Sequence, residues 1–176
     1  HIENLAKKVV EEGYSLGVAY DGDGDRCLCV DEKGNIMDGD IILAIVSDYL
    51  KKEGKLKNNT LVATVMSNLG LKKYCKDNDM QFIQTNVGDR YVLENMLANN
   101  YIIGGEQSGH IIFKELSNNG DGELTSLQVL EILSKTKKKL SELKSIMISY
   151  PQVLVNVAVT KEGKKLYVSD EEINNL

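Results

Sequence analysis

A short acidic run near the start of the chain constrains its fold more than any other feature. The run reads Tyr20-Asp21-Gly22-Asp23-Gly24-Asp25-Arg26, and β-prone residues lie on both sides of it. We therefore expect a loop at the end of a strand, in which glycines permit a tight turn and alternating carboxylates point toward one centre. Three converging anions need a counter-ion, and all-oxygen ligation favours Mg²⁺, Ca²⁺ or Mn²⁺. Asp21, Asp23 and Asp25 are accordingly predicted to bind a divalent cation.

Two other interpretations of this run compete with a cation-binding loop. An Asp- and Gly-rich surface turn is ordinary turn chemistry, but three regular repeats behind a strand argue against it. A calcium loop of the helix–loop–helix type would use the three aspartates as its first, third and fifth positions and Glu32 as its twelfth. That type requires glycine where Arg26 stands and a helix where a strand precedes the run, so we reject it.

An aspartyl phosphatase of the haloacid dehalogenase type is a third interpretation. Such enzymes place Asp-x-Asp at the end of a buried strand with the first Asp as nucleophile, which Asp21 and Asp23 fit. Asp25 stands where that pattern has Thr or Val, and Asp89 with Glu94 offers only a loosely spaced distal acidic motif. This alternative stays open at the level of sequence.

Length and composition bound the class of protein. The 176 residues are enough for one well-filled domain, or for one domain with pieces of its neighbours. A net charge of -5 argues against non-specific nucleic-acid binding, and no membrane-spanning run or signal peptide is visible, so we expect neither a nucleic acid nor a membrane as partner. The three cysteines, Cys27, Cys29 and Cys75, are expected to be buried free thiols, which indicates a reducing cytoplasm. The helical pattern already begins at His1, and the polar end at 170–176 has no obvious stop, so we expect a piece of a longer protein.

Hydrophobic periodicity predicts strands alternating with helices. The expected strands are 16–20, 27–31, 60–65, 81–85, 101–103 and 111–113, with a half-buried strand over 153–159. We place domain boundaries at the hairpin around Lys33 and near Pro151, the only proline. The pattern predicts an α/β fold, namely a three-layer α/β/α domain with a mixed sheet, flanked by partial neighbouring domains.

A second polar loop, residues 104–110, contains the other dense set of functional groups. Glu106 can accept two hydrogen bonds from vicinal hydroxyls, Ser108 can donate or accept, and His110 can donate, accept or carry a proton. Glycines around them permit close approach, which suits a sugar better than an apolar ligand. A turn with a structural histidine is the alternative.

Four motifs taken together resemble one enzyme family. They are Asp-Gly-Asp-x-Asp-Arg at 21–26, Val-Met-Ser-Asn-Leu-Gly at 65–70, Val-Gly-Asp-Arg-Tyr at 87–91 and Gly-Glu-Gln-Ser-Gly-His at 105–110. In this order they resemble the α-D-phosphohexomutases, and the last two look most like the bacterial phosphoglucosamine mutase branch. The resemblance runs from about His1 to Val159. That branch commonly has Ala where Gly24 stands, which leaves the cation ligands untouched.

The resemblance implies a position within a four-domain enzyme built around one cleft. Residues 1–33 correspond to the end of the metal-binding second domain, 34–150 to the sugar-binding third domain, and 151–176 to the start of the phosphate-binding fourth domain. The implied reaction moves a phosphoryl group between positions 6 and 1 of glucosamine phosphate, through a phosphoserine and a bisphosphate intermediate, and feeds amino-sugar nucleotide and cell-wall synthesis. The partners are a phosphorylated hexosamine and the remaining domains. Because the family's phosphoserine loop lies in the first domain, we expect no mutase activity from this chain alone.

The resemblance also implies roles for single residues. Asp21, Asp23 and Asp25 match the magnesium ligands, and Mg²⁺ would neutralise charge on the transferring phosphoryl group. Arg26 would contact that phosphoryl group, with a salt bridge to its neighbouring aspartates as the alternative. His110 would relay a proton to or from the reacting hydroxyl.

The remaining predicted site residues concern the sugar. Glu106 and Ser108 match the family's binders of sugar hydroxyls and would hold the ring in either of two orientations. Arg90 resembles a position that meets substrate, with a helix-surface cation as the alternative. Asp89 is expected to cap its own helix. A non-catalytic module that binds sugar phosphates is the other alternative for the chain, and it predicts stabilisation by ligand without turnover.

Overall fold

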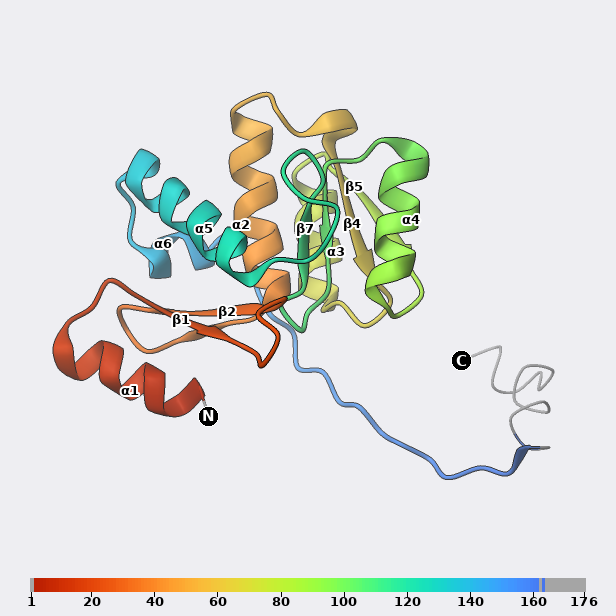
Figure 1. Cartoon of the computed structure of the whole chain (residues 1–176), viewed down its shortest axis with the longest axis horizontal. Helices are drawn as coiled ribbons and strands as arrows, with labels where there is room; N and C mark the ends of the chain where they lie inside the picture. Colours follow the sequence, from red (N-terminus) through yellow and green to blue (C-terminus); the bar gives the residue numbers. More distant parts are fainter. Residues whose placement is uncertain (1, 162, 164–176) are drawn as a thin grey trace.

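Two sheets form the framework of the chain, a small antiparallel one near the N-terminus and a larger mixed one (Figure 1). The computed structural model describes residues 2–161 and 163. Helix α1 (Ile2–Glu12) lies against the small sheet, whose strands are β1 (Leu16–Tyr20), β2 (Cys27–Asp31) and β3 (Ile36–Met37). Tyr20 is paired with Cys27 in the β1–β2 ladder, so the acidic run closes the hairpin as a loop, as its sequence predicts.

The larger sheet has the strand order β5-β4-β6-β7. Strands β5 (Gln81–Thr85), β4 (Thr60–Thr64) and β6 (Ile103–Gly105) are parallel, and β7 (Ile111–Phe113) is antiparallel to β6. Every residue of β4 is buried, as is typical of a parallel strand covered on both faces.

Helices cover both faces of the larger sheet. On one face, α2 (Gly39–Lys52), α3 (Leu69–Asp77) and α5 (Gly122–Thr136) share a core with Leu61 and Ala63 of β4. On the other face, α4 (Asp89–Asn99) packs against Val62, the residue between them. The short α6 (Leu140–Lys144) joins the first core, and a 3₁₀ turn η1 (Lys57–Asn59) precedes β4. The three-layer α/β/α fold with a mixed sheet is therefore confirmed.

The hairpin unit and the layered domain share one core. The side chains of Cys27, Cys29 and Met37 are fully buried in the same cluster as the α2 and α5 side chains. All three cysteines are free and buried, as predicted. No helix among residues 2–161 is long and apolar enough to cross a membrane.

Side-chain caps begin α2, α3 and α5. Asp38 accepts a hydrogen bond from the Ile41 amide at the start of α2, at 3.1 Å. Helix α4 instead begins after Gly88, whose φ of 129° is a conformation that favours glycine, and no side chain caps it. The prediction that Asp89 caps this helix is wrong, because Asp89 is already its first helical residue.

The predicted strand after Pro151 is absent from the described residues. Residues 151–160 have no secondary structure, and Val153 and Val157 are 83% and 73% exposed. The alternation of valines is present, but no described strand lies beside the segment to accept its backbone hydrogen bonds, and an unpaired strand is not stable alone. The rest of the predicted fourth-domain segment, residue 162 and residues 164–176, lies outside the described residues.

Candidate functional site

The three aspartates of the hairpin loop lie together. One carboxylate oxygen from each of Asp21, Asp23 and Asp25 lies within 4.8 Å of the other two. Asp21 and Asp23 are exposed and Asp25 is half-buried. The Oδ1 atom of Asp25 is buried without a hydrogen-bond donor in the described part of the chain. An orphaned anionic oxygen in an all-oxygen cluster fits a hard divalent cation such as Mg²⁺.

Arg26 is the cation that the protein itself supplies to this loop. Its Nε lies 3.6 Å from Asp21 Oδ2 and 3.8 Å from Asp25 Oδ1, and its amide donates to Asp21 Oδ1 at 3.2 Å. Desolvation raises the pKa of Asp21, but the amide of Arg26, Asp25 and the Arg26 guanidinium together lower it by more, so the net pKa of Asp21 is lowered. The carboxylate is therefore ionised at neutral pH, as a cation ligand must be.

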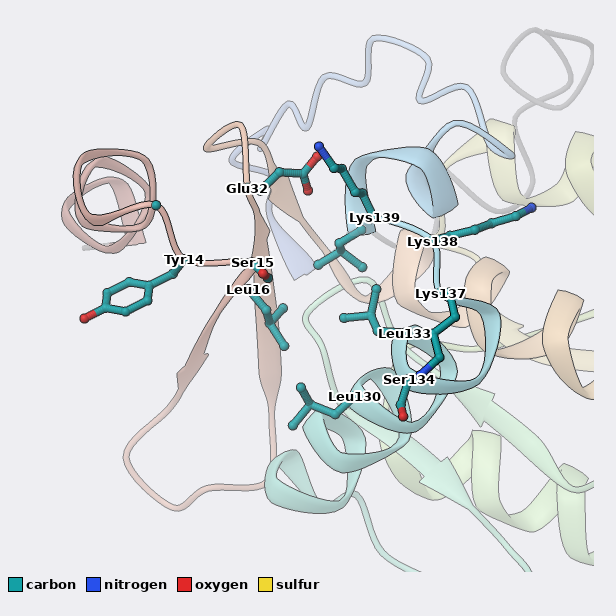
Figure 2. Close-up of a pocket in the computed structure, with 12 residues that line it drawn as sticks. Tyr14, Ser15, Leu16, Glu32, Leu130, Leu133, Ser134, Lys137, Lys138 and Lys139 are labelled. Carbon is teal, nitrogen blue, oxygen red and sulfur yellow. The ribbon is translucent and has the colours of Figure 1, made fainter.

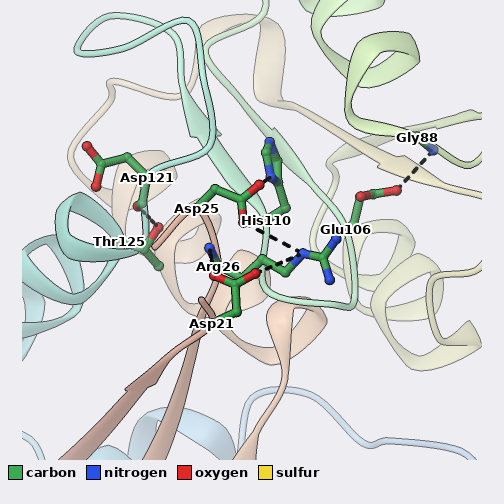
Figure 3. Close-up of polar contacts among 8 residues, drawn as sticks. All are labelled: Asp21, Asp25, Arg26, Gly88, Glu106, His110, Asp121 and Thr125. Atoms are coloured by element: carbon green, nitrogen blue, oxygen red, sulfur yellow. Dashed lines mark hydrogen bonds and ion pairs between the residues drawn. The ribbon is translucent and has the colours of Figure 1, made fainter. Parts of the chain in front are cut away.

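The acidic loop and the second polar loop meet through backbone as well as side chains (Figure 3). Arg26 and His110 form an isolated antiparallel bridge, and the Cys27 amide donates to the Gly109 carbonyl at 3.1 Å. His110 is 6% exposed, and its Nδ1 lies 3.0 Å from Asp25 Oδ2. Residues 21–26 and 104–110 thus form one site, although about 80 residues separate them in sequence.

Glu106, in the same polar loop as His110, lines a cleft. Its Oε1 accepts a hydrogen bond from the Gly88 amide at 3.0 Å, which joins the loop to the start of α4 (Figure 3). The cleft has a volume of about 440 Å³ and is lined by Arg26, Thr64, Met66, Val87, Glu106, Gln107 and Ser108. A neighbouring hollow of about 350 Å³ shares Arg26 and Ser108 with it and includes Asp21. Charged and hydroxyl groups therefore line a space that extends from the acidic loop, residues 21–26 and hereafter the cation loop, to the second polar loop, residues 104–110.

Arg90 has a different environment from the other predicted site residues. Its Nε donates to Glu94 Oε1 at 2.7 Å along the exposed surface of α4, and its side chain is 80% exposed. It lines neither of the two hollows beside the acidic loop. Its contact with substrate stays a prediction.

A larger hollow of about 660 Å³ lies away from these residues (Figure 2). Leu16, Leu130, Leu133 and Leu140 form apolar walls, and the connection between α5 and α6 passes along its rim. It contains none of the predicted cation or sugar residues, so its size alone does not make it the candidate site.

The start of α5 is part of the site, and sequence reasoning missed it. The Gly122 amide donates to the Gly24 carbonyl at 2.9 Å, and a Cβ at Gly120 would overlap the His110 ring. Asp121 between them caps the helix by accepting from the Leu124 amide at 2.8 Å. The Gly-Asp-Gly triplet at 120–122 is the signal that could have indicated a close approach of backbone at this position.

A buried carboxylate supports the loop that contains Met66. Asp40, in the first turn of α2, is fully buried, and its Oδ2 accepts from the Asn68 amide at 2.6 Å. Burial raises the pKa of Asp40 to about 6, with a further increase from the charge of Asp38, while the hydrogen bond from the Asn68 amide opposes the rise.

Asn68 in turn fixes the exit of the chain from the domain. Its side-chain oxygen accepts from the amides of Gly70 and Tyr150, each at 2.9 Å, and its side-chain nitrogen donates to the Tyr150 carbonyl at 2.8 Å. Gln152 also donates to the Met66 carbonyl at 2.9 Å. The cleft-lining loop and the segment around Pro151 are therefore joined directly.

Known proteins resemble this chain in both sequence and fold. Residues 38–150 match the family model "Phosphoglucomutase/phosphomannomutase, alpha/beta/alpha domain III". A phosphoglucosamine mutase from Acetivibrio thermocellus is 57% identical over 173 residues, which are 98% of this chain and 38% of that protein. A phosphoglucosamine mutase from Clostridium beijerinckii is 53% identical over 175 residues, which are 99% of this chain and 39% of that protein.

A solved structure supports the fold independently. The crystal structure of a phosphoglucomutase/phosphomannomutase family protein from Burkholderia thailandensis superposes with a TM-score of 0.71 at 24% identity, over 88% of this chain and 33% of that one. At this identity the likeness shows the fold alone. The chain spans about two fifths of the length of the curated relatives it matches. None of these matches supports the phosphatase interpretation of Asp21.

Proposed function

The chain belongs to the phosphoglucomutase/phosphomannomutase family, and we propose that it forms the cation-binding and sugar-binding parts of a phosphoglucosamine mutase. In this proposal residues 1–33 end the metal-binding domain, 34–150 form the sugar-binding domain and 151–176 begin the phosphate-binding domain. The observation that carries the proposal is the direct contact between the cation loop and the second polar loop, through the Arg26–His110 bridge.

The proposed substrate is a phosphorylated hexosamine, whose phosphoryl group moves between positions 6 and 1. Glu106 and Ser108 line the cleft and would bind ring hydroxyls, while Arg26 at its edge would form charged hydrogen bonds with the transferring phosphoryl group. Because both ends of the sugar must react, hydroxyl contacts that tolerate two ring orientations suit this chemistry better than a tight single-orientation pocket. The high identity to phosphoglucosamine mutases supports the amino sugar as substrate.

His110 is proposed to move a proton at the reacting hydroxyl. It is held at Nδ1 by Asp25 Oδ2, and its ring is fixed by the close approach of Gly120. Nε2 lies against Gly120 and His110 lines neither of the two hollows, so the proton would move through Nδ1, on the side of Asp25 and the acidic loop.

Mg²⁺ is the proposed cofactor, and Asp21, Asp23 and Asp25 would hold it. When bound, the ion neutralises negative charge that develops on the transferring phosphoryl group. The Arg26 contacts described above hold the carboxylates of Asp21 and Asp25 close together. The serine donor is proposed to come from outside these residues, so we expect no turnover by this chain alone. We further propose the cytoplasm as its location, where buried free thiols stay reduced.

Cation binding by the purified chain tests the proposal. Titration with Mn²⁺, followed by the electron paramagnetic resonance of the free ion, should show one saturable site. Asp23→Asn should weaken binding at least about tenfold, because it removes one of three anionic ligands. Asp79→Asn is the matched control, since Asp79 is an exposed aspartate on the turn between α3 and β5. Equal binding by the parent chain and Asp23→Asn would refute the cation site.

Sugar binding is tested separately on the same protein. In the presence of Mg²⁺, glucosamine 6-phosphate should shift the amide resonances of Glu106 and Ser108, and Glu106→Gln should abolish the shift. Shifts confined to the larger hollow around Leu130 and Leu133 would contradict the assignment of the cleft.

A further inference from the structure

The first turns of α5 press directly on the backbone of the cation loop. The Gly122 amide donates to the Gly24 carbonyl at 2.9 Å. A Cβ at position 122 would lie 2.5 Å from the Arg26 carbonyl oxygen and 2.8 Å from that of Gly24. Since real Cβ atoms do not come this close to carbonyl oxygens, glycine at this position is what permits the contact. The helix therefore fixes the loop between its second and third aspartates, and again just after the third.

A side-chain hydrogen bond fixes the start of the same loop. Tyr20, which directly precedes Asp21, has its hydroxyl 2.7 Å from the Ser126 hydroxyl on α5. Ser126 Oγ donates its single proton to the Glu123 carbonyl at 2.8 Å, so it must accept the proton of Tyr20. Ser126 is 5% exposed and Tyr20 is 44% exposed, so the bond is partly buried and its Ser126 end is shielded from water.

The helix that makes these contacts is itself well anchored. Asp121 caps it through the Leu124 amide, and Thr125 Oγ1 donates to the Asp121 carbonyl at 2.7 Å (Figure 3). Val129 and Ile132, one and two turns later, are buried in the main core. A loop held at both ends by an anchored helix keeps its carboxylates at a fixed separation.

We propose that residues 120–126, the α5 brace, set the spacing of the cation loop, and that Tyr20 and Ser126 are a positioning pair that favours Mg²⁺ over Ca²⁺. The inference rests on the proposed cation site. Mg²⁺ requires oxygen ligands at about 2.0–2.1 Å in near-ideal geometry, whereas Ca²⁺ accepts about 2.3–2.6 Å and irregular geometry. A loop held rigidly at its two ends can meet the stricter demand, and a loosened loop loses Mg²⁺ first. Neither member of the pair is itself a ligand.

The test compares Tyr20→Phe, Ser126→Ala and the double variant with the parent chain. Tyr14→Phe is the matched control, because Tyr14 is 50% exposed and its ring points into solvent at the other end of β1 (Figure 2). Mn²⁺ is the probe, and Mg²⁺ and Ca²⁺ are measured by competition against it. We expect each single variant to weaken Mg²⁺ binding about three- to tenfold, as the loss of one partly buried hydrogen bond predicts.

Selectivity and additivity distinguish positioning from general stability. The affinity for Ca²⁺ should fall less than that for Mg²⁺, and the double variant should bind like the single ones because both substitutions remove the same bond. Thermal unfolding without cation shows how far each variant is destabilised. The brace would be overturned if the affinities for Mg²⁺ and Ca²⁺ fell equally and in proportion to the destabilisation of each variant. It would also be overturned if the variants bound both cations as Tyr14→Phe does.

The same titrations separate this inference from the proposed function. A parent chain that binds neither cation overturns the cation site and the brace together. A parent chain that binds Mg²⁺, loses it in Asp23→Asn and keeps it unchanged in Tyr20→Phe and Ser126→Ala overturns the brace alone.

Discussion

Asp40→Asn should change how the stability of the protein depends on pH. Asp40 is fully buried, and burial raises its pKa from 3.8 to about 6. A carboxyl group with a raised folded-state pKa favours folding most when it is protonated. Its contribution is therefore complete below about pH 4 and is lost as the pH rises through about 6. At about 1.4 kcal/mol for each pH unit between these values, ionising the buried group costs the fold at most about 3 kcal/mol.

Asparagine at position 40 removes this cost because it stays neutral at every pH. Its side-chain oxygen can still accept from the Asn68 amide, and the difference between a charged and a neutral acceptor there is already contained in the raised pKa of Asp40. Its amide nitrogen takes the place of Asp40 Oδ1, an atom without a hydrogen-bond partner among the described residues, beside the equally unpartnered Ser67 Oγ. The variant should thus gain up to about 3 kcal/mol of unfolding free energy at pH 8 and differ from the parent chain by less than about 1 kcal/mol at pH 4, where Asp40 is itself protonated and neutral.

Urea unfolding at several pH values between 4 and 8 measures this difference. Subtracting the parent chain from Asp40→Asn isolates the titration of Asp40, because all other groups are shared. Asp79→Asn, at an exposed position, should give a flat difference curve. A flat curve for Asp40→Asn as well, or a variant less stable than the parent chain at pH 8, would refute the reasoning.

The remaining predictions concern His110, Asn68 and the thiols. Gly120→Ala should displace the His110 ring and lower the unfolding free energy by about 1–3 kcal/mol; ring resonances identical to those of the parent chain would contradict this. Asn68→Ala leaves the amides of Gly70 and Tyr150 without their acceptor, so hydrogen exchange at Tyr150 should accelerate at least about tenfold, and unchanged protection would show that the contact is dispensable. The three fully buried cysteines should react with a thiol reagent only as fast as the protein opens; rapid labelling in native buffer would disagree with the structure.

Regular apolar spacing was enough to predict most of the fold. The strands at 16–20, 27–31, 81–85 and 111–113 begin and end where the sequence predicts. The segment after Pro151 shows what periodicity leaves out, because alternating valines specify a strand only when a partner strand is present. The sequence also did not predict that Gly88 precedes the first residue of α4, because the Asp at the next position looks like an ordinary cap.

The sequence predicts the group of carboxylates at the candidate site better than the contacts that support it. The spacing of Asp21, Asp23 and Asp25 indicated the cation cluster that the structure brings together. The contact between Gly122 and the loop joins positions about 100 residues apart, and no local pattern encodes it. The burial of Asp40 was not predicted for another reason. An acidic residue in the first turn of a helix is usually solvated, and only tertiary packing buries this one.

The Arg26–His110 bridge is made by main-chain atoms, and this has a consequence for how the family could diversify. The pairing requires glycine at 109, where a Cβ would lie 2.5 Å from the Cys27 carbonyl oxygen, but it leaves the distance between the acidic loop and the second polar loop independent of most of their other side chains. Under the proposed function, Ser108 can therefore be exchanged to accept a different sugar while the geometry of the acidic loop is preserved, whereas Gln107 is tied to the start of α2 through Asp38 Oδ2 at 3.2 Å. The relative position of the hairpin and the mixed sheet can therefore stay constant while side chains at the two loops change.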